Sequence, residues 1–399
     1  MKYGANMAAE LDVLIVGGGI HGTGVAQAAA AAGYSVRLLE QTAIAHGTSS
    51  RSSKLIHGGL RYLETGQFSL VRESLRERRL LLELAPEIVR LVPFHIPVYK
   101  STRRRPWQIR AGLGLYALLG GMAGDNRFST LARSQWDSLD GLETQDLQAV
   151  FRYYDGQTDD ALLTRAVMQS AQALGAELMV PARFLQARLE NDRVVIEYEA
   201  GKKAESCTAR VLVNAAGPWT NQVLEKISPS IPIPEIELVK GTHIRVAGSM
   251  SAGNYYMETP QDGRAVFAMP RDDSILVGTT EARFSGDPDK VAASEQEQQY
   301  LLDVLSHYFP HYQSPQNAAI LSAYAGVRVL PGGEGNAFKR TRETILKMDR
   351  SQRPRVLSVY GGKLTTWRAT AENVIMHLST SLPTRKPRAR TDQLTLLPA

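Results

Sequence analysis

The distribution of apolar residues predicts a strand–helix–strand unit at the start of the chain. Residues 11–16 form a continuous apolar run, which is typical of a strand buried on both faces of a parallel sheet. An alanine-rich segment at 19–32 predicts a helix that ends at Gly33, and residues 35–40 predict a second strand. Because parallel strands are joined by a crossover that is usually a helix, this order indicates a βαβ unit.

The hydrophobic pattern changes in the middle of the chain. A charged amphipathic helix is predicted over 68–84, and strands are predicted over 194–198 and 210–213. Short apolar runs separated by polar turns then predict a mostly antiparallel sheet, and these runs span 237–246, 254–258, 265–269 and 275–278. Helices are predicted again over 294–307 and 365–378.

These elements indicate a chain of the α/β plus α+β class, in which a β-rich substrate domain is inserted in a Rossmann-type cofactor domain. We expect the discontinuous cofactor domain to comprise residues 10–100, 150–220 and 322–383. The substrate domain is expected to comprise residues 101–149 and 221–321. Residues 384–399 lack apolar periodicity and are predicted to form a disordered tail.

The composition is that of an ordinary globular protein, with 43% hydrophobic and 22% charged residues among 399. The single cysteine, Cys207, excludes an intramolecular disulfide and a cysteine-based metal site, so a reducing cytoplasm is the expected compartment. The first residues contain no apolar signal core. The apolar stretches stop short of the roughly 20 residues that a membrane span requires. We expect neither a bound metal nor a membrane-spanning helix.

The net charge of +6 favours an anionic partner, which could be phosphate, acidic lipid or nucleic acid. Arginines cluster at 103–105, and residues 384–399 carry four more basic side chains. No zinc-finger spacing, aromatic–basic RNA motif or helix-turn-helix pattern accompanies them. We therefore expect no nucleic-acid partner.

A dinucleotide fingerprint lies between the first strand and the first helix. Gly17-Gly18-Gly19-Ile20-His21-Gly22 supplies the pattern G-x-G-x-x-G. Gly17 allows the tight turn, Gly19 the approach of a pyrophosphate, and Gly22 the packing of helix on strand, while the helix N-terminus attracts the phosphates. Glu40 ends the second predicted strand, where a carboxylate accepts hydrogen bonds from ribose. This unit does not by itself distinguish FAD from NAD.

The next segment is rich in hydroxyl groups and leads into a glycine pair. Thr48-Ser49-Ser50-Arg51-Ser52-Ser53-Lys54 precedes Leu55-Ile56-His57-Gly58-Gly59-Leu60-Arg61-Tyr62. From composition alone, the hydroxyls either contact a cofactor or cap the start of a helix.

Residues 48–64, TSSRSSKLIHGGLRYLE, resemble the FAD-dependent, aerobic and quinone-linked glycerol-3-phosphate dehydrogenase family, within the D-amino-acid-oxidase-like flavoproteins. Five further segments match in order, and they are LVNAAGPW at 212–219, VKGTHI at 239–244, GTTE at 278–281, YAGVRVL at 324–330 and VYGGKLTT at 359–366. Any one of them could be an ordinary strand-to-turn glycine, but six in register are specific.

The resemblance implies a flavoprotein with FAD as its cofactor, which would make the cofactor domain an FAD-binding domain. The implied reaction is oxidation of sn-glycerol 3-phosphate to dihydroxyacetone phosphate, with hydride transfer from C2 to flavin N5 and electrons passed to membrane quinone. Two alternatives stay open. One is an oxidase or dehydrogenase of another small hydroxy or amino acid, and the other is a flavin subunit that requires a partner.

The resemblance also implies site residues. Basic side chains would bind the substrate phosphate, because the planar arginine fork suits it, and the substrate set is Arg61, Tyr62, Arg328, Arg342 and Lys363. His243 is the first candidate for the base that takes the C2 hydroxyl proton and His57 the second, with Lys363 and Arg328 beside them in catalysis. The implied flavin contacts are Gly17, Gly19, Ile20, His21, Gly22, Glu40, Thr48, Ser49, Ser50, Ser53, Lys54, Ala216, Gly217, Trp219, Gly362, Lys363, Leu364, Thr365 and Thr366.

Two features bear on the electron acceptor, which could be quinone, oxygen or another molecule. The family usually continues into a helical C-terminal domain that is expected to be missing here. Residues 103–119 join three arginines and a tryptophan to a short apolar helix, which favours a peripheral anchor on the anionic inner face of the cell membrane. The alternative is a buried core helix with a solvated basic lead.

Overall fold

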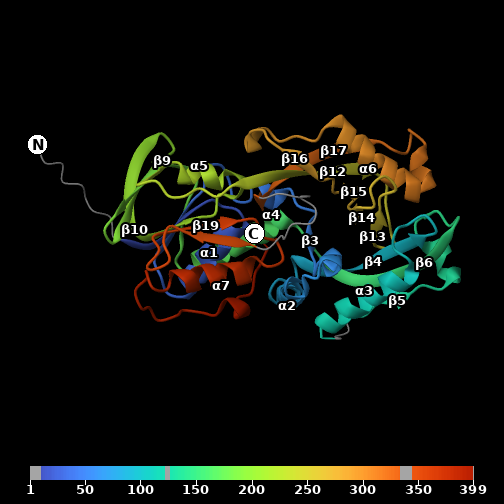
Figure 1. Cartoon of the computed structure of the whole chain (residues 1–399), viewed down its shortest axis with the longest axis horizontal. Coiled ribbons are helices and arrows are strands. Elements are labelled where there is room, and N and C mark those ends of the chain that lie inside the picture. The colour runs from blue at the N-terminus through green and yellow to red at the C-terminus, as the bar shows by residue number, and fades with distance from the viewer. Residues whose placement is uncertain (1–9, 122–125, 333–343, 399) are drawn as a thin grey trace, which may run out of the picture.

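The computed structural model describes residues 10–121, 126–332 and 344–398. Two large sheets lie at opposite ends of an elongated molecule, with helices between and around them (Figure 1). The helices of the described residues are α1 (Ile20–Ala31), α2 (Phe68–Leu84), α3 (Pro106–Leu119), α4 (Asp160–Ala173), α5 (Thr220–Leu224), α6 (Glu295–Tyr308) and α7 (Trp367–Leu378).

The first sheet has nine strands, ordered β11-β8-β9-β10-β1-β2-β7, with β19 paired to both β10 and β18. Its centre is parallel, because β1 pairs in parallel with β2 and β10, and β10 pairs in parallel with β19. The strands are β1 (Leu11–Val16), β2 (Val36–Leu39), β7 (Glu177–Met179), β8 (Ala182–Glu190), β9 (Arg193–Ala200), β10 (Lys203–Asn214), β11 (Ile227–Ser228), β18 (Ile345–Met348) and β19 (Val356–Tyr360).

The second sheet has ten strands, ordered β16-β12-β15-β14-β13-β4-β6-β3, with β17 on β12 and β5 on β6. Most of its pairings are antiparallel, as the short apolar runs predict. The strands are β3 (Leu55–Ile56), β4 (Val89–Tyr99), β5 (Ser129–Thr130), β6 (Leu147–Thr158), β12 (Ile236–Ala247), β13 (Asn254–Glu258), β14 (Ala265–Arg271), β15 (Ser274–Gly278), β16 (Ala282–Phe284) and β17 (Ile320–Pro331).

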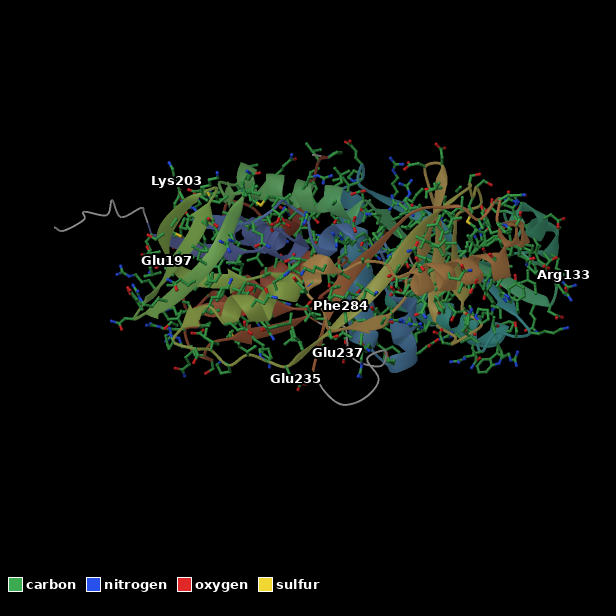
Figure 2. The ribbon with its side chains drawn as sticks, turned by 90° about the horizontal axis from the view of Figure 1, so that it is seen from above. Arg133, Glu197, Lys203, Glu235, Glu237 and Phe284 are labelled. Carbon is green, nitrogen blue, oxygen red and sulfur yellow. The ribbon has the colours of Figure 1, made fainter. Side chains whose placement is uncertain are left out.

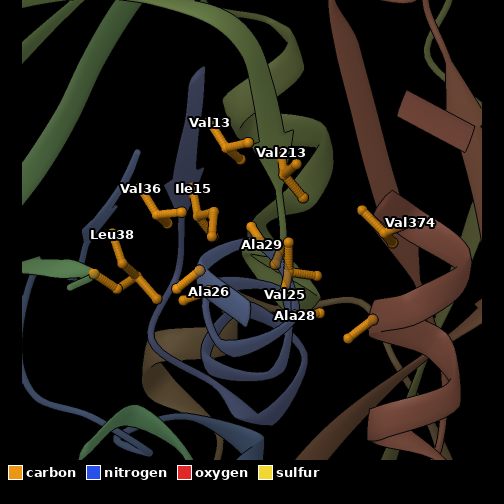
Figure 3. Close-up of a cluster of buried hydrophobic side chains, with 14 of the residues drawn as sticks. Val13, Ile15, Val25, Ala26, Ala28, Ala29, Val36, Leu38, Val213 and Val374 are labelled. Atoms are coloured by element: carbon orange, nitrogen blue, oxygen red, sulfur yellow. The ribbon is translucent and has the colours of Figure 1, made fainter. Parts of the chain in front are cut away.

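The core of the first sheet explains why helix α1 is rich in alanine. Ala26 and Ala29 of α1 face Ile15 of β1 and Val213 of β10, and Val374 of α7 lies on the other side of the helix (Figure 3). A Cβ atom at Gly24 would lie 2.7 Å from the indole ring of Trp367, so only glycine lets α7 pack this closely. Small side chains therefore bring both helices close to the sheet that carries the nucleotide fingerprint.

Two expectations from the sequence need correction. Strands β4, β6 and β17 belong to the second sheet, although the cofactor domain was expected to include residues 89–99, 150–158 and 322–331. These segments join the second sheet because β4 pairs with β6, and β17 with β12, in long antiparallel ladders. The apolar pattern of a strand does not identify the strand with which it pairs.

The predicted disordered tail is also wrong for residues 384–398. Arg385 forms an ion pair with Asp12 at 3.0 Å, and Thr391 accepts a hydrogen bond from Arg368 at 2.9 Å. Leu396 is buried in the cluster that contains Trp367. Individual contacts of Arg385, Thr391 and Leu396, rather than a periodic apolar face, hold this segment on the helices of the first sheet. Hydrophobic periodicity therefore did not predict that the segment is ordered.

Within the described ranges, no helix is both long enough and apolar enough to cross a membrane.

Candidate active site

A cavity of about 490 Å³ runs along the carboxyl ends of β1, β2 and β10 and reaches the second sheet. A smaller cavity of about 140 Å³ adjoins it. The two cavities share six of their lining residues, which are Ser53, Leu55, His57, Tyr62, Thr279 and Arg328. The larger volume is in the range of nucleotide-sized ligand sites, and the smaller cavity opens from it.

The fingerprint glycines form the tight turn between β1 and α1. Gly17 has a φ of +108°, and a Cβ atom there would lie 2.6 Å from the carbonyl oxygen of Ala215. A Cβ atom at Gly22 would lie 1.9 Å from the carbonyl oxygen of Gly17, so this turn requires glycine twice. Gly19 caps α1 without a side-chain hydrogen bond. The helix N-terminus thus faces the larger cavity without a side-chain cap, which suits a diphosphate.

Glu40 is held in the wall of the larger cavity. Its Oε2 accepts a hydrogen bond from the amide of Gly18 at 2.7 Å, and its Oε1 accepts one from the amide of Thr42 at 2.7 Å. Each carboxylate oxygen retains a lone pair that a ribose hydroxyl could donate to. Ser49 also lies at this end, where its Oγ accepts from the amide of Ile20 at 2.9 Å.

The predicted flavin contacts divide into two groups. Four do not line either cavity, and each has another structural role: Gly22 packs on Gly17, Ser50 donates to Gly47, Lys54 pairs with the fully buried Asp160, and Thr366 is buried at the start of α7. The predicted contacts that line the larger cavity are Gly17, Gly19, Ile20, His21, Glu40, Thr48, Ser49, Ser53, Ala216, Gly217, Trp219, Gly362, Lys363, Leu364 and Thr365.

The turn before α7 packs directly on the fingerprint helix. Gly362 has a φ of +93°, and a Cβ atom there would lie 2.2 Å from Nε2 of His21. Burial lowers the pKa of His21 to about 4, so this ring is neutral near pH 7. Thr365 accepts a hydrogen bond from the amide of His57 at 3.1 Å. The C-terminal turn is thereby joined to both the nucleotide helix and the loop that begins at His57.

Two arginines converge on one carboxylate in the smaller cavity. Arg61 Nη1 lies 3.7 Å from Glu281 Oε2, and Arg328 Nη1 lies 3.9 Å from Glu281 Oε1. The Glu281 side chain is 6% exposed, whereas both arginine side chains are 31% exposed. Two guanidinium groups therefore meet at this wall of the smaller cavity, and guanidinium groups are suited to bind an anion such as phosphate. The predicted Arg342 lies outside the described residues.

Lys363 adds a third cation beside this pair. Its ammonium nitrogen lies 3.8 Å from the centroid of the Tyr62 ring, and the two residues line the larger cavity together. A cation over an aromatic face is held in place by electrostatic attraction to the ring. Of the predicted substrate residues that are described, Arg61, Tyr62, Arg328 and Lys363 therefore lie around the junction of the two cavities.

His243 is buried beneath this junction. Its Nε2 lies 2.9 Å from Ser53 Oγ, and its ring stacks on Tyr324 with centroids 5.0 Å apart. Burial lowers the pKa of His243 to about 3, and the charges of Arg328 and Lys54 add to this effect. The imidazole is therefore neutral at physiological pH and has a nitrogen available to take up a proton. His57, the second candidate base, lines both cavities.

Several cavity residues were not singled out from the sequence. Ala182, Arg183 and Phe184 of β8 line the larger cavity, but they carry no motif that separates them from other strand residues. Glu281 is the last residue of the matched segment GTTE, but the sequence did not indicate that it contacts Arg61 and Arg328. Within the described residues, no group of three or more His, Cys, Asp or Glu side chains is arranged to hold a metal ion.

Comparison with known proteins identifies a matching family and two similar curated proteins. The family described as FAD dependent oxidoreductase matches residues 12–370. A glycerol-3-phosphate dehydrogenase of Pseudomonas aeruginosa is 40% identical over 380 residues, covering 94% of this chain and 72% of the relative. A D-erythritol 1-phosphate dehydrogenase of Brucella abortus is 37% identical over 390 residues, covering 93% and 74%.

Among solved structures, the chain is similar to the glycerol-3-phosphate dehydrogenase of Bacillus halodurans complexed with FAD. The TM-score is 0.74 at 26% identity, and the alignment covers 97% of this chain and 68% of that one.

Proposed function

The chain belongs to the FAD-dependent oxidoreductase family, and from this premise we propose that it oxidises sn-glycerol 3-phosphate to dihydroxyacetone phosphate. FAD is its cofactor. The observation that carries the proposed substrate is the convergence of Arg61 and Arg328 in a small cavity beside the nucleotide cleft. The names of the two curated relatives, both dehydrogenases of a polyol phosphate, support the same substrate class.

Residues of the larger cavity would hold FAD. The N-terminus of α1 would bind its diphosphate, Glu40 would accept hydrogen bonds from a ribose, and the turn at Gly362 would line the remaining part of the site. Bound FAD supplies the acceptor for the hydride that leaves C2 of the substrate.

Arg61, Arg328 and Lys363 bind the phosphate and fix the position of the substrate. Both guanidinium groups and the ammonium group can donate charge-assisted hydrogen bonds to a phosphate dianion. Because the pair lies at the junction of the two cavities, phosphate binding brings the carbinol carbon toward the larger one. Arg328 and Lys363 act in catalysis through this positioning.

His243 takes up the proton of the C2 hydroxyl at Nε2, next to Ser53 Oγ. Its low pKa keeps it neutral and ready to accept a proton, but makes the protonated form costly beside Arg328. The phosphate dianion on Arg328 reduces that cost, so substrate binding itself strengthens the base. His57 is the alternative proton acceptor, since it also lines both cavities.

The acceptor of the electrons is proposed to be a quinone at an anionic membrane surface, reached through α3. Trp107 and Leu118 of this helix are 68% and 62% exposed, and Arg103, Arg105 and Arg110 are exposed beside them. The opposite face of α3, which includes Leu113 and Tyr116, is buried. Arg104 does not belong to the outer face, because it pairs with Glu64 and Glu258.

Anaerobic mixing of the purified holoprotein with sn-glycerol 3-phosphate, followed at the flavin absorbance near 450 nm, tests the proposed substrate. We expect rapid bleaching with the phosphate ester and much slower bleaching with glycerol at the same concentration. D-Erythritol 1-phosphate is the comparison that the Brucella relative suggests. Faster bleaching with that compound would reassign the substrate within the polyol phosphates, and no bleaching with either would reject the class.

A further inference from the structure

The loop that carries Arg61 and Tyr62 is anchored at two consecutive amides. The amide of His57 donates to Thr365 Oγ1 at 3.1 Å, and the amide of Gly58 donates to the hydroxyl of Tyr116 at 2.8 Å. Thr365 precedes α7 and Tyr116 lies on α3, and α2 lies between these two helices (Figure 1). The loop is therefore held from two sides by elements that are far apart in the sequence.

The Tyr116 hydroxyl is itself fixed by a buried charge pair. It donates to Asp155, with oxygens 2.8 and 2.9 Å away, and Arg78 Nη1 donates to Asp155 Oδ1 at 2.6 Å. Tyr116, Asp155 and Arg78 are each at most 2% exposed. A buried network with its members hydrogen-bonded in this way is rigid, so the hydroxyl is a fixed acceptor for the Gly58 amide.

The absence of a side chain at Gly58 is also explained by its contact with Tyr116. A Cβ atom at Gly58 would lie 2.5 Å from the Tyr116 hydroxyl oxygen and 2.6 Å from Leu75 Cδ2. Both distances are shorter than real Cβ contacts, so the first glycine of the glycine pair is required by the close approach of α3 and of Leu75 on α2. Asp155 lines the smaller cavity, and the network thus reaches the wall of the substrate site.

We propose that Tyr116 is a positioning residue for the loop of residues 57–62, which presents Arg61 and Tyr62 to the substrate phosphate. This inference rests on the proposed function. Arg61 reaches the smaller cavity, and the ring of Tyr62 lies under the ammonium group of Lys363. Tyr116 touches neither cavity, so its effect on the substrate passes through the Gly58 amide. α3 therefore serves the substrate site with its inner face.

Tyr116→Phe in the holoprotein tests this role. The variant leaves the Gly58 amide without its acceptor, and we expect the KM for sn-glycerol 3-phosphate to rise about five- to tenfold while kcat changes less than about twofold. The constant for competitive inhibition by inorganic phosphate should rise by the same factor, because the loop presents a phosphate contact. Flavin content should stay unchanged.

Tyr255→Phe is the matched control. The Tyr255 hydroxyl is also buried and also donates to a carboxylate, Asp140, at 2.8 Å, but neither residue lines the larger or the smaller cavity of the active site. Equal changes in the two variants would show that general destabilisation is responsible, and an unchanged KM in Tyr116→Phe would overturn the proposal outright.

Two further measurements keep the outcome decisive. If Tyr116→Phe does not fold, Gly58→Ala must show the same rise in KM, because its methyl group displaces the same hydroxyl. If the native protein is not reduced by sn-glycerol 3-phosphate, the proposed function is wrong. The loop is then tested by the dissociation constant of inorganic phosphate, read from the flavin spectrum of each variant, and equal constants in the native protein and Tyr116→Phe would refute it.

Discussion

Replacing Arg328 by alanine tests the phosphate site most directly. A charge-assisted contact typically contributes about 1.5–3 kcal/mol, which corresponds to about tenfold to 150-fold in catalytic efficiency. The Arg328 side chain is 31% exposed and already lies 3.9 Å from Glu281, so solvent and that carboxylate both weaken its attraction for phosphate. We therefore expect kcat/KM for sn-glycerol 3-phosphate to fall about ten- to thirtyfold, toward the lower end of the range.

Arg328 is proposed to contact the phosphate group, so the assay must compare a substrate that carries a phosphate with one that does not. Steady-state rates with a soluble dye should show the loss with sn-glycerol 3-phosphate and little change with glycerol, which has no phosphate to bind. Arg328→Lys should recover part of the loss. Arg133→Ala is the control, because Arg133 is exposed, lines neither cavity, and lies at the opposite end of the molecule from Glu197 and Lys203 (Figure 2). An equal loss with both substrates would refute a phosphate contact at Arg328.

Three further predictions concern the cofactor, the stability and the membrane. Gly17→Ala should give folded but colourless protein, because Gly17 has a φ of +108° and a Cβ atom has no room there. Gly112→Ala on α3 is the control and should keep its flavin. Normal flavin absorbance in Gly17→Ala would contradict the placement of FAD at the fingerprint turn. Burial lowers the pKa of three histidines from 6.5 to about 4, 4 and 3, and these are His21, His95 and His243. Each stays neutral in the fold but takes a proton when unfolded, so stability is present above pH 6.5 and is lost as the pH falls, by about 2 kcal/mol per histidine between pH 7 and 5. Urea unfolding at fixed FAD should show this decline, and a flat profile would contradict the burial. Trp107→Ala should reduce the sedimentation of the protein with anionic vesicles and its reduction of quinone in those vesicles, while its activity with a soluble dye stays unchanged. Equal sedimentation of the native protein and Trp107→Ala would reject the proposed membrane-binding face of α3.

The nucleotide half of the site could be predicted because its signals are local. Strand β1 and helix α2 have the bounds that the hydrophobic pattern predicts, since a buried strand and an amphipathic helix each show their own periodicity. Helix α4 was missed although its signal was present. Asp159 accepts from the amide of Leu162 at 2.8 Å as an N-cap, and apolar residues follow at helical spacing. The signal of α4 is local, whereas the pairing of β4 with β6 depends on contacts between distant segments that no local pattern records.

Helix α3 shows where sequence-based inference ends. The arginines and the tryptophan that led to the membrane hypothesis are close together in the sequence, so that hypothesis could be formed from the sequence alone and stays a prediction. Tyr116 on the inner face lies 58 positions from Gly58 and 39 from Asp155, and nothing in its neighbourhood along the chain distinguishes it from a core tyrosine. Only the second sheet, by placing β6 beneath the loop, gives its hydroxyl both a donor and an acceptor. Because the role of Tyr116 is defined by two partners that are distant in the sequence, no local pattern around Tyr116 indicates it. Gly58, which leaves room for the Tyr116 hydroxyl, is the feature of the sequence that reflects this contact.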